Sequence, residues 1–260
     1  MDNRQKPIGF FDSGVGGLSV LRHALSVLPN ENYIYYGDDK NAPYGTRSEK
    51  EIRELSLRCG EFLYDKGVKL IVVACNTATS VAIREMRSQF NIPVLSMEPA
   101  VKPALSALRD GGKVLVMATP ATITQQRYNL LLDRLSCRDK VINMKCGGLV
   151  EIVEKGDFNS KDLNDYLEAK LSPLKGQRID AIVMGCTHYS FISEKIEHIA
   201  KQYVDGEAKI FDGMYGVVRY LKTTLEQKDL INKDGRGSVE LYSSIPGKEE
   251  IYRQLIHNEQ

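Results

Sequence analysis

Two cysteines occupy matching positions in the sequence. Cys75 follows an apolar run at 69–74, and Cys186 follows a similar run at 179–185. Both runs are short, continuous and rich in β-branched residues, which is typical of a strand covered on both faces. Small polar residues and a helical pattern come after each cysteine. A thiol at each of two equivalent strand ends suits acid–base chemistry on the two faces of one small molecule.

Cys75 lies between its expected strand and a helix in which apolar residues recur every four positions from Ala78. Backbone N–H groups at a helix start lower the pKa of a thiol from its free value of about 8.5, which favours the reactive thiolate. A buried, inert cysteine is the alternative. The polar neighbours Asn76, Thr77 and Thr79 give the functional role the same weight as the inert one, because a core position seldom needs so many polar neighbours.

Asp12 ends an apolar run at 7–11 and precedes a glycine-rich turn at 13–17. The turn does not match the dinucleotide fingerprint G-x-G-x-x-G, because Ser19 stands at its sixth position. Its backbone N–H groups, at the start of a helix, suit a small anion such as a carboxylate. Asp12 would be an acceptor in the same crevice, and capping the helix is its alternative role.

The composition excludes several classes of partner and site. Lys plus Arg is 35 and Asp plus Glu is 34, so a net charge of +1 gives no field that would attract nucleic acid or an anionic membrane. No apolar run has transmembrane length and no secretory signal is recognisable, so we expect a cytoplasmic protein. Five cysteines and four histidines show neither CxxC pairs nor zinc spacing, so we expect no metal and no disulfide framework.

The elements that position the cysteines alternate between strands and helices along the chain, which predicts an α/β fold. Nearly equal separations relate Ile8 to Val114, Tyr33 to Val141 and Cys75 to Cys186. These matches indicate two similar α/β units. The prolines of EPAVKPAL mark the best boundary, and the expected domains are 1–98 plus 213–260 and 99–212.

Three further expectations concern particular segments. Thr119 and Thr122 follow a strand as Asp12 and Ser13 do. The segment SVELYSS reads as a strand of a tail that packs back onto the first unit, and residues 247–260 read as a solvated helix.

The loop DDKNAPYGTRS follows the strand at 32–37, at the end of a parallel sheet where ligands bind. A plain surface connection is the alternative for this loop.

With these motifs in place, the chain closely resembles the cofactor-independent glutamate racemases of bacteria. The resemblance spans nearly the whole chain and is carried by FDSGVGGLSV, YYGDDKNAPYGTRS, VVACNTATS, VLSMEPAVKPAL, ATPATI and MGCTHYS, in the family's order. It implies two pseudo-symmetric α/β domains with mainly parallel sheets that face each other across a cleft, with one cysteine from each. It further implies action on glutamate without pyridoxal phosphate or metal, a homodimer, and supply of D-glutamate for cell-wall peptidoglycan.

The resemblance also assigns roles to individual residues. It places Asp12 beside Cys75, and His188 with Glu154 beside Cys186, as acid–base groups; Glu151 is a nearby rival of Glu154. Capping of the following helix is the alternative role for His188. Substrate binding falls to Asp12, Ser13, Pro43, Tyr44, Gly45, Asn76, Thr77, Thr119, Thr122, Thr187 and His188.

The sequence departs from the family's pattern at Asp39, Ala118, Gly147 and Gly213. None of these departures removes an expected catalytic group, but they put subunit contacts, loop mobility and substrate preference in doubt. Three other functions compete with glutamate racemisation. They are a related enzyme acting on aspartate, a cysteine hydrolase that uses one thiol with a histidine, and a non-enzymatic binding protein on the same scaffold.

Overall fold

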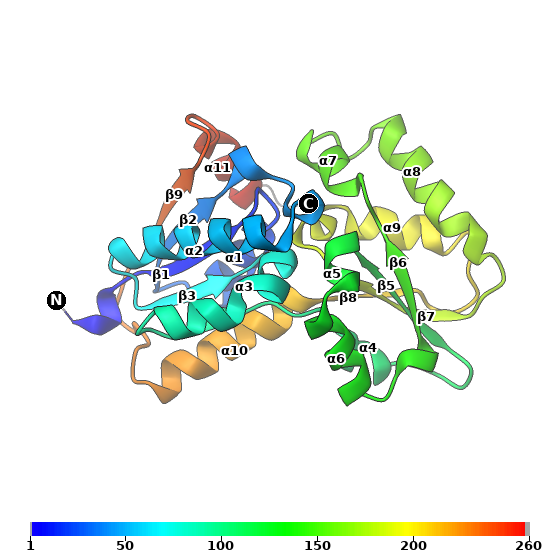
Figure 1. Ribbon diagram of the computed structural model, residues 1–260, viewed down its shortest axis with the longest axis horizontal. Helices are drawn as coiled ribbons and strands as arrows, with labels where there is room; N and C mark the ends of the chain where they lie inside the picture. Colours follow the sequence, from blue (N-terminus) through cyan, green and yellow to red (C-terminus); the bar gives the residue numbers. More distant parts are fainter. Residues whose placement is uncertain (1, 258–260) are drawn as a thin grey trace. The chain divides into compact units, whose positions relative to one another are not determined.

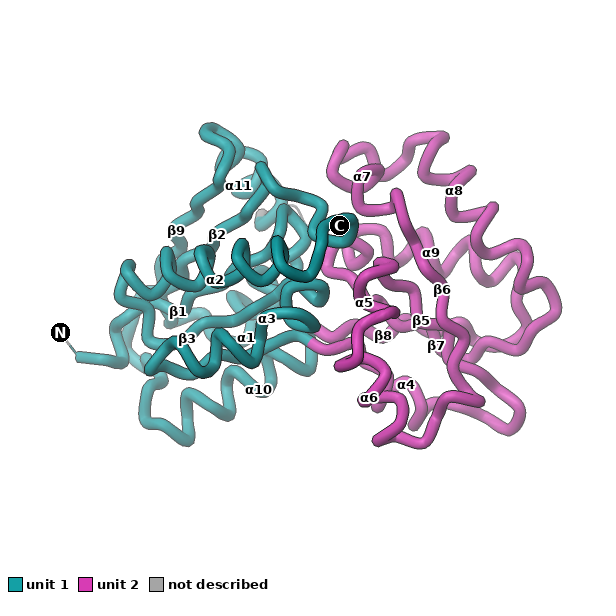
Figure 2. The backbone as a smooth tube through the Cα atoms, viewed as in Figure 1, with its two compact units in different colours: residues 1–97, 214–260 teal, residues 98–213 magenta. Residues whose placement is uncertain are grey.

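The computed structural model describes residues 2–257 and divides into two compact units, Met1–Met97 with Met214–Gln260 and Glu98–Gly213 (Figure 2). Each unit contains one parallel sheet with helices packed on it, which confirms the predicted α/β class. No helix in the described range is both long and apolar enough to cross a membrane.

The first unit is built on a five-stranded parallel sheet with the order β4-β3-β1-β2-β9. Its strands are β1 (Ile8–Asp12), β2 (Asn32–Gly37), β3 (Leu70–Val73), β4 (Val94–Ser96) and β9 (Ser238–Ser243). Its helices are α1 (Leu18–Val27), α2 (Glu49–Asp65), α3 (Asn76–Gln89), α10 (Gly213–Gln227) and α11 (Glu249–His257), with 3-10 turns η1 (Asn3–Gln5), η2 (Asp39–Asn41) and η3 (Tyr44–Thr46).

Alternate residues of the strands face opposite layers of helices. Phe11 and Val73 belong to a buried cluster with the apolar residues of α2 and α3, which lie together on one face of the sheet (Figure 1). Tyr33 points to the other face, where its hydroxyl donates to the carbonyl oxygens of Ala24 and Leu28 at the end of α1. Burial on both faces explains why the strands read as continuous apolar runs.

The second unit is built on a four-stranded parallel sheet with the order β6-β5-β7-β8. Its strands are β5 (Lys113–Ala118), β6 (Val141–Lys145), β7 (Ile179–Met184) and β8 (Lys209–Asp212). Its helices are α4 (Val101–Leu105), α5 (Pro120–Thr124), α6 (Gln126–Arg134), α7 (Leu149–Glu154), α8 (Lys161–Leu171) and α9 (Ser193–Ala200), with 3-10 turns η4 (Arg138–Lys140), η5 (Ser172–Leu174) and η6 (Thr187–Ile192).

The two sheets repeat one topology. Read from its edge, β8-β7-β5-β6 has the same pattern as β4-β3-β1-β2. Ile8 of β1 is paired with Tyr33 and Leu70, and its counterpart Val114 of β5 is paired with Val141 and Ala181. The matches that the sequence indicated between strands are therefore matches in register as well.

Strand register corrects the expected equivalence of Asp12 with Thr119. The N–H of Asp38 donates to the carbonyl of Asp12, and the N–H of Cys146 donates to the carbonyl of Ala118 in the same way. Ala118 therefore corresponds to Asp12, and Thr119 to Ser13. The sequence pattern does not distinguish the two pairings, because the last residue of the strand and the first residue of the turn are both small or polar.

The C-terminal segment differs from the expectation in one respect. SVELYSS does form a strand, β9, which pairs with β2 of the first unit. The following helix α11 is not simply solvated, because Tyr252 is completely buried and Ile256 is 9% exposed. Residues 258–260 of the expected helix lie outside the described part of the chain.

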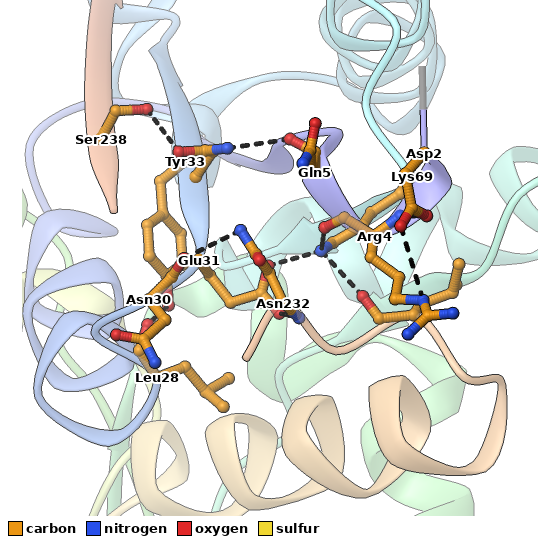
Figure 3. Close-up of polar contacts among 12 residues, drawn as sticks. Asp2, Arg4, Gln5, Leu28, Asn30, Glu31, Tyr33, Lys69, Asn232 and Ser238 are labelled. Atoms are coloured by element: carbon orange, nitrogen blue, oxygen red, sulfur yellow. Dashed lines mark hydrogen bonds and ion pairs between the residues drawn. The ribbon is translucent and has the colours of Figure 1, made fainter. Parts of the chain in front are cut away.

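A buried ion pair joins segments at the amino ends of β2 and β3 (Figure 3). Lys69 Nζ donates to Glu31 Oε2 at 2.5 Å and to the carbonyls of Arg4 and Leu230. The other oxygen of Glu31 accepts the N–H of Asn232 at 2.8 Å. Both charged side chains are only 1% exposed. The pair thus fastens the N-terminal turn and the segment that leads into β9 to the sheet.

Candidate active site

The carboxyl ends of β1, β2 and β3 meet at one edge of the first sheet, where open parallel sheets bind ligands. Asp12 is the last residue of β1 and is fully buried, and Ser13 follows it. Cys75 stands two residues beyond β3, and its thiol donates to Ser13 Oγ at 3.7 Å. The structure therefore brings the predicted residues at 12, 13 and 75 together at this edge.

Cys75 is the N-cap of α3. The backbone N–H of Ala78 donates to its sulfur at 3.4 Å, and Cys75 is 5% exposed. A thiolate in this place is stabilised by that N–H and by the positive end of a helix of 14 residues. The sulfur therefore contacts a hydroxyl and an amide, and Cys75 also belongs to the buried apolar cluster of this unit.

Asp12 is not the N-cap residue of α1, the alternative position expected for it. That position is held by Gly17, which has no side chain to cap the helix. Gly17 passes so close to the strand end that a Cβ there would lie 2.6 Å from Cβ of Asp12 and 2.9 Å from the Tyr35 hydroxyl. Glycine at this position thus allows the turn to fold tightly over Asp12.

Asn76 and Thr77 form the first turn of α3, and both are 4% exposed. Within residues 2–257, neither the oxygen nor the nitrogen of the Asn76 side-chain amide has a hydrogen-bond partner. Leaving a buried polar group unpaired costs about 1–3 kcal/mol. Such a cost is common where a ligand supplies the missing partner.

The loop after β2 carries the predicted residues Pro43, Tyr44 and Gly45, the first after a cis peptide bond. Tyr44 is 1% exposed, and its hydroxyl donates to Asp38 Oδ2 at 2.7 Å and lies 3.7 Å from Cys59 Sγ. The hydroxyl of Tyr44 therefore points into the unit. A ligand at this loop would meet its backbone and not the phenol oxygen.

In the second unit, Cys186 stands two residues beyond β7, as Cys75 does beyond β3. The sulfur lies 3.7 Å from Nδ1 of His188, and Nε2 of His188 lies 2.7 Å from Glu154 Oε1. Thiol, imidazole and carboxylate thus form a continuous chain. Glu154, on α7, fills the predicted place beside His188, whereas its rival Glu151 is exposed.

The environment of His188 favours its charged form. Burial lowers the pKa of this histidine, but the hydrogen bonds and charges of Cys186 and Glu154 outweigh burial and raise the pKa well above its ordinary value. His188 is not the N-cap residue of η6 or of α9, since those residues are Cys186 and Ile192. An imidazolium beside Cys186 would stabilise its thiolate.

The predicted threonines of the second unit lie at the carboxyl ends of β5 and β7. Thr119 caps α5, with its hydroxyl oxygen 3.2 Å from the N–H of Thr122 and 3.0 Å from the Thr122 hydroxyl. Thr187 follows Cys186 and is 1% exposed. Gly185 lets β7 approach β5 closely, because a Cβ there would lie 2.6 Å from Cβ of Ala118.

Most of the chain matches the model of a known protein family. The family model described as Asp/Glu/Hydantoin racemase matches residues 18–213. The chain belongs to the Asp/Glu/Hydantoin racemase family.

Individual members of the family resemble the chain over nearly its whole length. The glutamate racemase of Clostridium perfringens (strain 13 / Type A) is 46% identical over 259 residues, which cover 98% of each chain. The solved glutamate racemase of Francisella tularensis, in complex with D-glutamate, has a TM-score of 0.83 and 31% identity over 99% of this chain and 96% of its own. The Escherichia coli glutamate racemase, in complex with L-glutamate and the activator UDP-MurNAc-ala, has a TM-score of 0.81 and 28% identity over 96% and 95%. The resemblance that the motifs indicated is confirmed.

Two residues near the candidate racemase groups were not recognised from the sequence as part of the site. Asp38 holds the Tyr44 hydroxyl and accepts from the side-chain amide of Asn41 at 2.9 Å. Cys146 follows β6, where its carbonyl accepts from the hydroxyl of Tyr189 at 3.1 Å. Burial raises the pKa of the Cys146 thiol to about 12. The available signal was position alone, since both residues immediately follow a strand.

The described residues contain no group of three His, Cys, Asp or Glu side chains that could hold a metal ion.

Proposed function

We propose that the protein interconverts L- and D-glutamate by proton transfer at Cα, with Cys75 and Cys186 as the two acid–base groups. One observation carries the proposal. Two sheets of the same topology each present a buried cysteine two residues beyond the corresponding strand. Racemisation needs this kind of pair, because one group must remove the proton from one face of Cα while another returns a proton to the opposite face.

The two thiols alternate in role. When one is a thiolate, the other is a thiol, and the hand of the substrate decides which accepts the proton. Cys75 as thiolate is supported by the N–H of Ala78 at the start of α3. Cys186 as thiolate is supported by the His188 imidazolium, whose charge is in turn balanced by Glu154. Asp12 is the proposed auxiliary acid–base group beside Cys75.

Glutamate is the proposed substrate for two reasons. The relatives are glutamate racemases, and the polar residues near each cysteine suit its charged groups. A zwitterion with two carboxylates needs many hydrogen-bond donors and at least one acceptor for its ammonium group. The unpaired Asn76 amide offers both. The remaining proposed contacts come from the side chains or backbones of Asp12, Ser13, Pro43, Tyr44, Gly45, Thr77, Thr119, Thr122, Thr187 and His188.

The absence of a cofactor, the use of the product and the oligomeric state belong to the same proposal. Proton transfer between two thiols uses neither pyridoxal phosphate nor a metal. The product, D-glutamate, would supply peptidoglycan synthesis in the cytoplasm, and the active form would be a homodimer. Light scattering during size-exclusion chromatography tests the dimer, which should have twice the 29.2 kDa mass of the chain.

Incorporation of solvent deuterium tests the reaction itself. In deuterated water, the wild-type protein should place deuterium at Cα while it converts either enantiomer of glutamate into the other. Cys75→Ser and Cys186→Ser should each abolish racemisation in both directions, because each direction needs both groups. Full activity in one of these variants would instead indicate single-thiol chemistry, as in a cysteine hydrolase.

Aspartate is the second candidate substrate, because the matched family includes aspartate racemases by its description. Loss of optical rotation measured side by side with L-glutamate and L-aspartate decides between them. Turnover of aspartate alone would exclude glutamate. Absence of Cα exchange with both amino acids would favour a binding protein on the same scaffold.

A further inference from the structure

The carboxylate of Asp39 is buried at the start of the loop after β2, although it is not one of the proposed catalytic or substrate-binding groups. Its side chain has no exposed surface. Lys248 Nζ lies 2.6 Å from Oδ1, and Oδ2 accepts from the hydroxyls of Ser243, at 2.7 Å, and Tyr252. Pairing of this kind offsets the cost of burying a carboxylate.

All three partners of Asp39 come from one distant part of the sequence, residues 243–252, which comprises the end of β9 and the first half of α11. Two backbone contacts add to this connection. The N–H of Lys40 donates to Ser244 Oγ at 2.9 Å, and the N–H of Ser244 donates to the carbonyl of Gly37. The C-terminal segment therefore binds both the backbone of the loop and the side chain of Asp39.

Glycine at position 37 makes this close approach possible. A Cβ there would lie 1.9 Å from the Tyr252 hydroxyl and 3.0 Å from Asp39 Oδ2. The hydroxyl of Tyr252 thus sits directly over the backbone where β2 ends. Tyr252 of α11 therefore packs against both the end of β2 and the buried carboxylate of Asp39.

The loop that Asp39 anchors is also tied internally. Asp38 binds the side chain of Asn41 and the hydroxyl of Tyr44, and the carbonyl of Asn41 accepts from Arg47 Nε at 2.5 Å. A displacement at Asp39 is therefore carried along residues 38–47. Pro43, Tyr44 and Gly45, the proposed substrate contacts, lie in the middle of this range.

Tyr252 also reaches a second part of the candidate site. Its ring packs edge-on against Tyr35, with 5.4 Å between the ring centres. The Tyr35 hydroxyl in turn donates to the carbonyl of Gly14, in the turn that follows Asp12, at 2.6 Å. The helix α11 thus supports both loops that carry the proposed substrate residues of the first unit.

We propose that Asp39 and Lys248 are positioning residues of the racemase, which hold the loop 38–47 in the geometry that binds substrate. The inference rests on the proposed function, since it assigns that loop to the substrate. A buried ion pair contributes little net stability, because desolvation offsets its attraction, but loss of one partner leaves an uncompensated charge. The pair therefore fixes where the loop lies more than it strengthens the fold.

Lys248→Met is the decisive variant, and Arg253→Met is its matched control. Both remove a cation from the C-terminal segment, but Arg253 pairs with the exposed Glu250 and not with Asp39. Lys248→Met should raise KM for L- and D-glutamate by about tenfold while kcat stays within about twofold, because loop misplacement weakens binding of substrate and transition state alike. Arg253→Met should leave both constants unchanged.

A double variant tests whether the effect of Lys248→Met comes from the unpaired charge that it leaves on Asp39. Asp39→Asn combined with Lys248→Met removes both charges and keeps an oxygen for Ser243 and Tyr252. We expect its KM to return to within about threefold of the wild-type value, a non-additive result that direct coupling produces. A double variant no better than Lys248→Met alone would overturn the pairing of these residues.

Hydrogen exchange gives a readout that does not need activity. The backbone N–H groups of Asn41, Ala42 and Arg47 are bonded within the loop, to the carbonyls of Asp38, Asp39 and Tyr44 respectively. They should exchange faster in Lys248→Met and at the wild-type rate in Arg253→Met. Unchanged exchange, or faster exchange with an unchanged KM, would overturn the inference. Wild-type protein that does not racemise glutamate would instead overturn the proposed function, and the exchange result would still test the anchoring.

Discussion

Glu154 and His188 share a 2.7 Å contact between a carboxylate oxygen and the imidazole nitrogen that faces away from Cys186. The two residues come from α7 and η6, which pack against each other. Since the contact keeps a proton on His188, the histidine can hold the neighbouring sulfur as thiolate or return a proton to it. The carboxylate therefore influences Cys186 through the imidazole.

Glu154→Gln should therefore lower the pKa of His188, because the raising effect of the carboxylate is lost. We expect kcat/KM to fall roughly 10²-fold, and its decline with rising pH to begin at a lower pH than in the wild type. The fall must be equal for the two enantiomers, since they have equal free energies. Titration of the His188 ring by NMR checks the shift. Glu151→Gln, at an exposed position of the same helix, is the control, and an unshifted ring in Glu154→Gln would contradict the assignment.

The same pair predicts how stability depends on pH. The pKa of His188 is higher in the folded state than its usual 6.5, so the folded protein holds this proton more tightly. The resulting contribution to the free energy of unfolding is complete below about pH 6.5 and disappears as the pH rises through the folded-state pKa. Urea unfolding of the wild type and His188→Gln at several pH values should show a difference that shrinks as pH increases. A difference that grows would refute the charged imidazole.

Cys75 has a structural role that can be separated from its proposed chemistry. Serine is a good N-cap, so Cys75→Ser should keep the bond from Ala78 and unfold at the wild-type urea concentration or slightly above it. Cys75→Ala should lose about 1 kcal/mol of stability. Both should lack racemase activity. If the alanine variant is as stable as the serine variant, the sulfur does not cap α3.

The sequence predicted the strands, and with them the position of each cysteine just beyond a strand, because apolar runs buried on two faces leave a continuous signal. It could not choose firmly between Glu151 and Glu154, which are three residues apart on one short helix. That choice depends on the rotation of α7 against η6, a packing relation with no local signature. The charged residues around Tyr252 predicted a solvated helix at 247–260. The burial of that tyrosine depends on Gly37 and Tyr35, more than 200 positions away.

Asn76 offers a test in which stability and binding change in opposite directions. Its buried amide has no partner within the described chain, so Asn76→Ala removes an unpaired group. The variant should be as stable as the wild type, or more stable by up to about 1 kcal/mol, in the absence of substrate. Its KM for glutamate should nevertheless rise, by about tenfold for the loss of one bond to a charged group. Reduced stability together with an unchanged KM would mean that the amide is structural.

The ion pair between Lys69 and Glu31 should affect stability without affecting catalysis. It lies at the amino ends of β2 and β3 (Figure 3), whereas the proposed substrate residues of the same unit follow the carboxyl ends of its strands. Lys69→Met leaves a buried carboxylate without its cation and should cost about 3–5 kcal/mol. Combining it with Glu31→Gln should recover part of that loss, because the unpaired charge is gone. Under conditions where the variants stay folded, kcat and KM should match the wild type. A change in KM would show that the amino edge of the sheet influences the substrate loops, and would contradict the expected independence of catalysis from the Lys69–Glu31 pair.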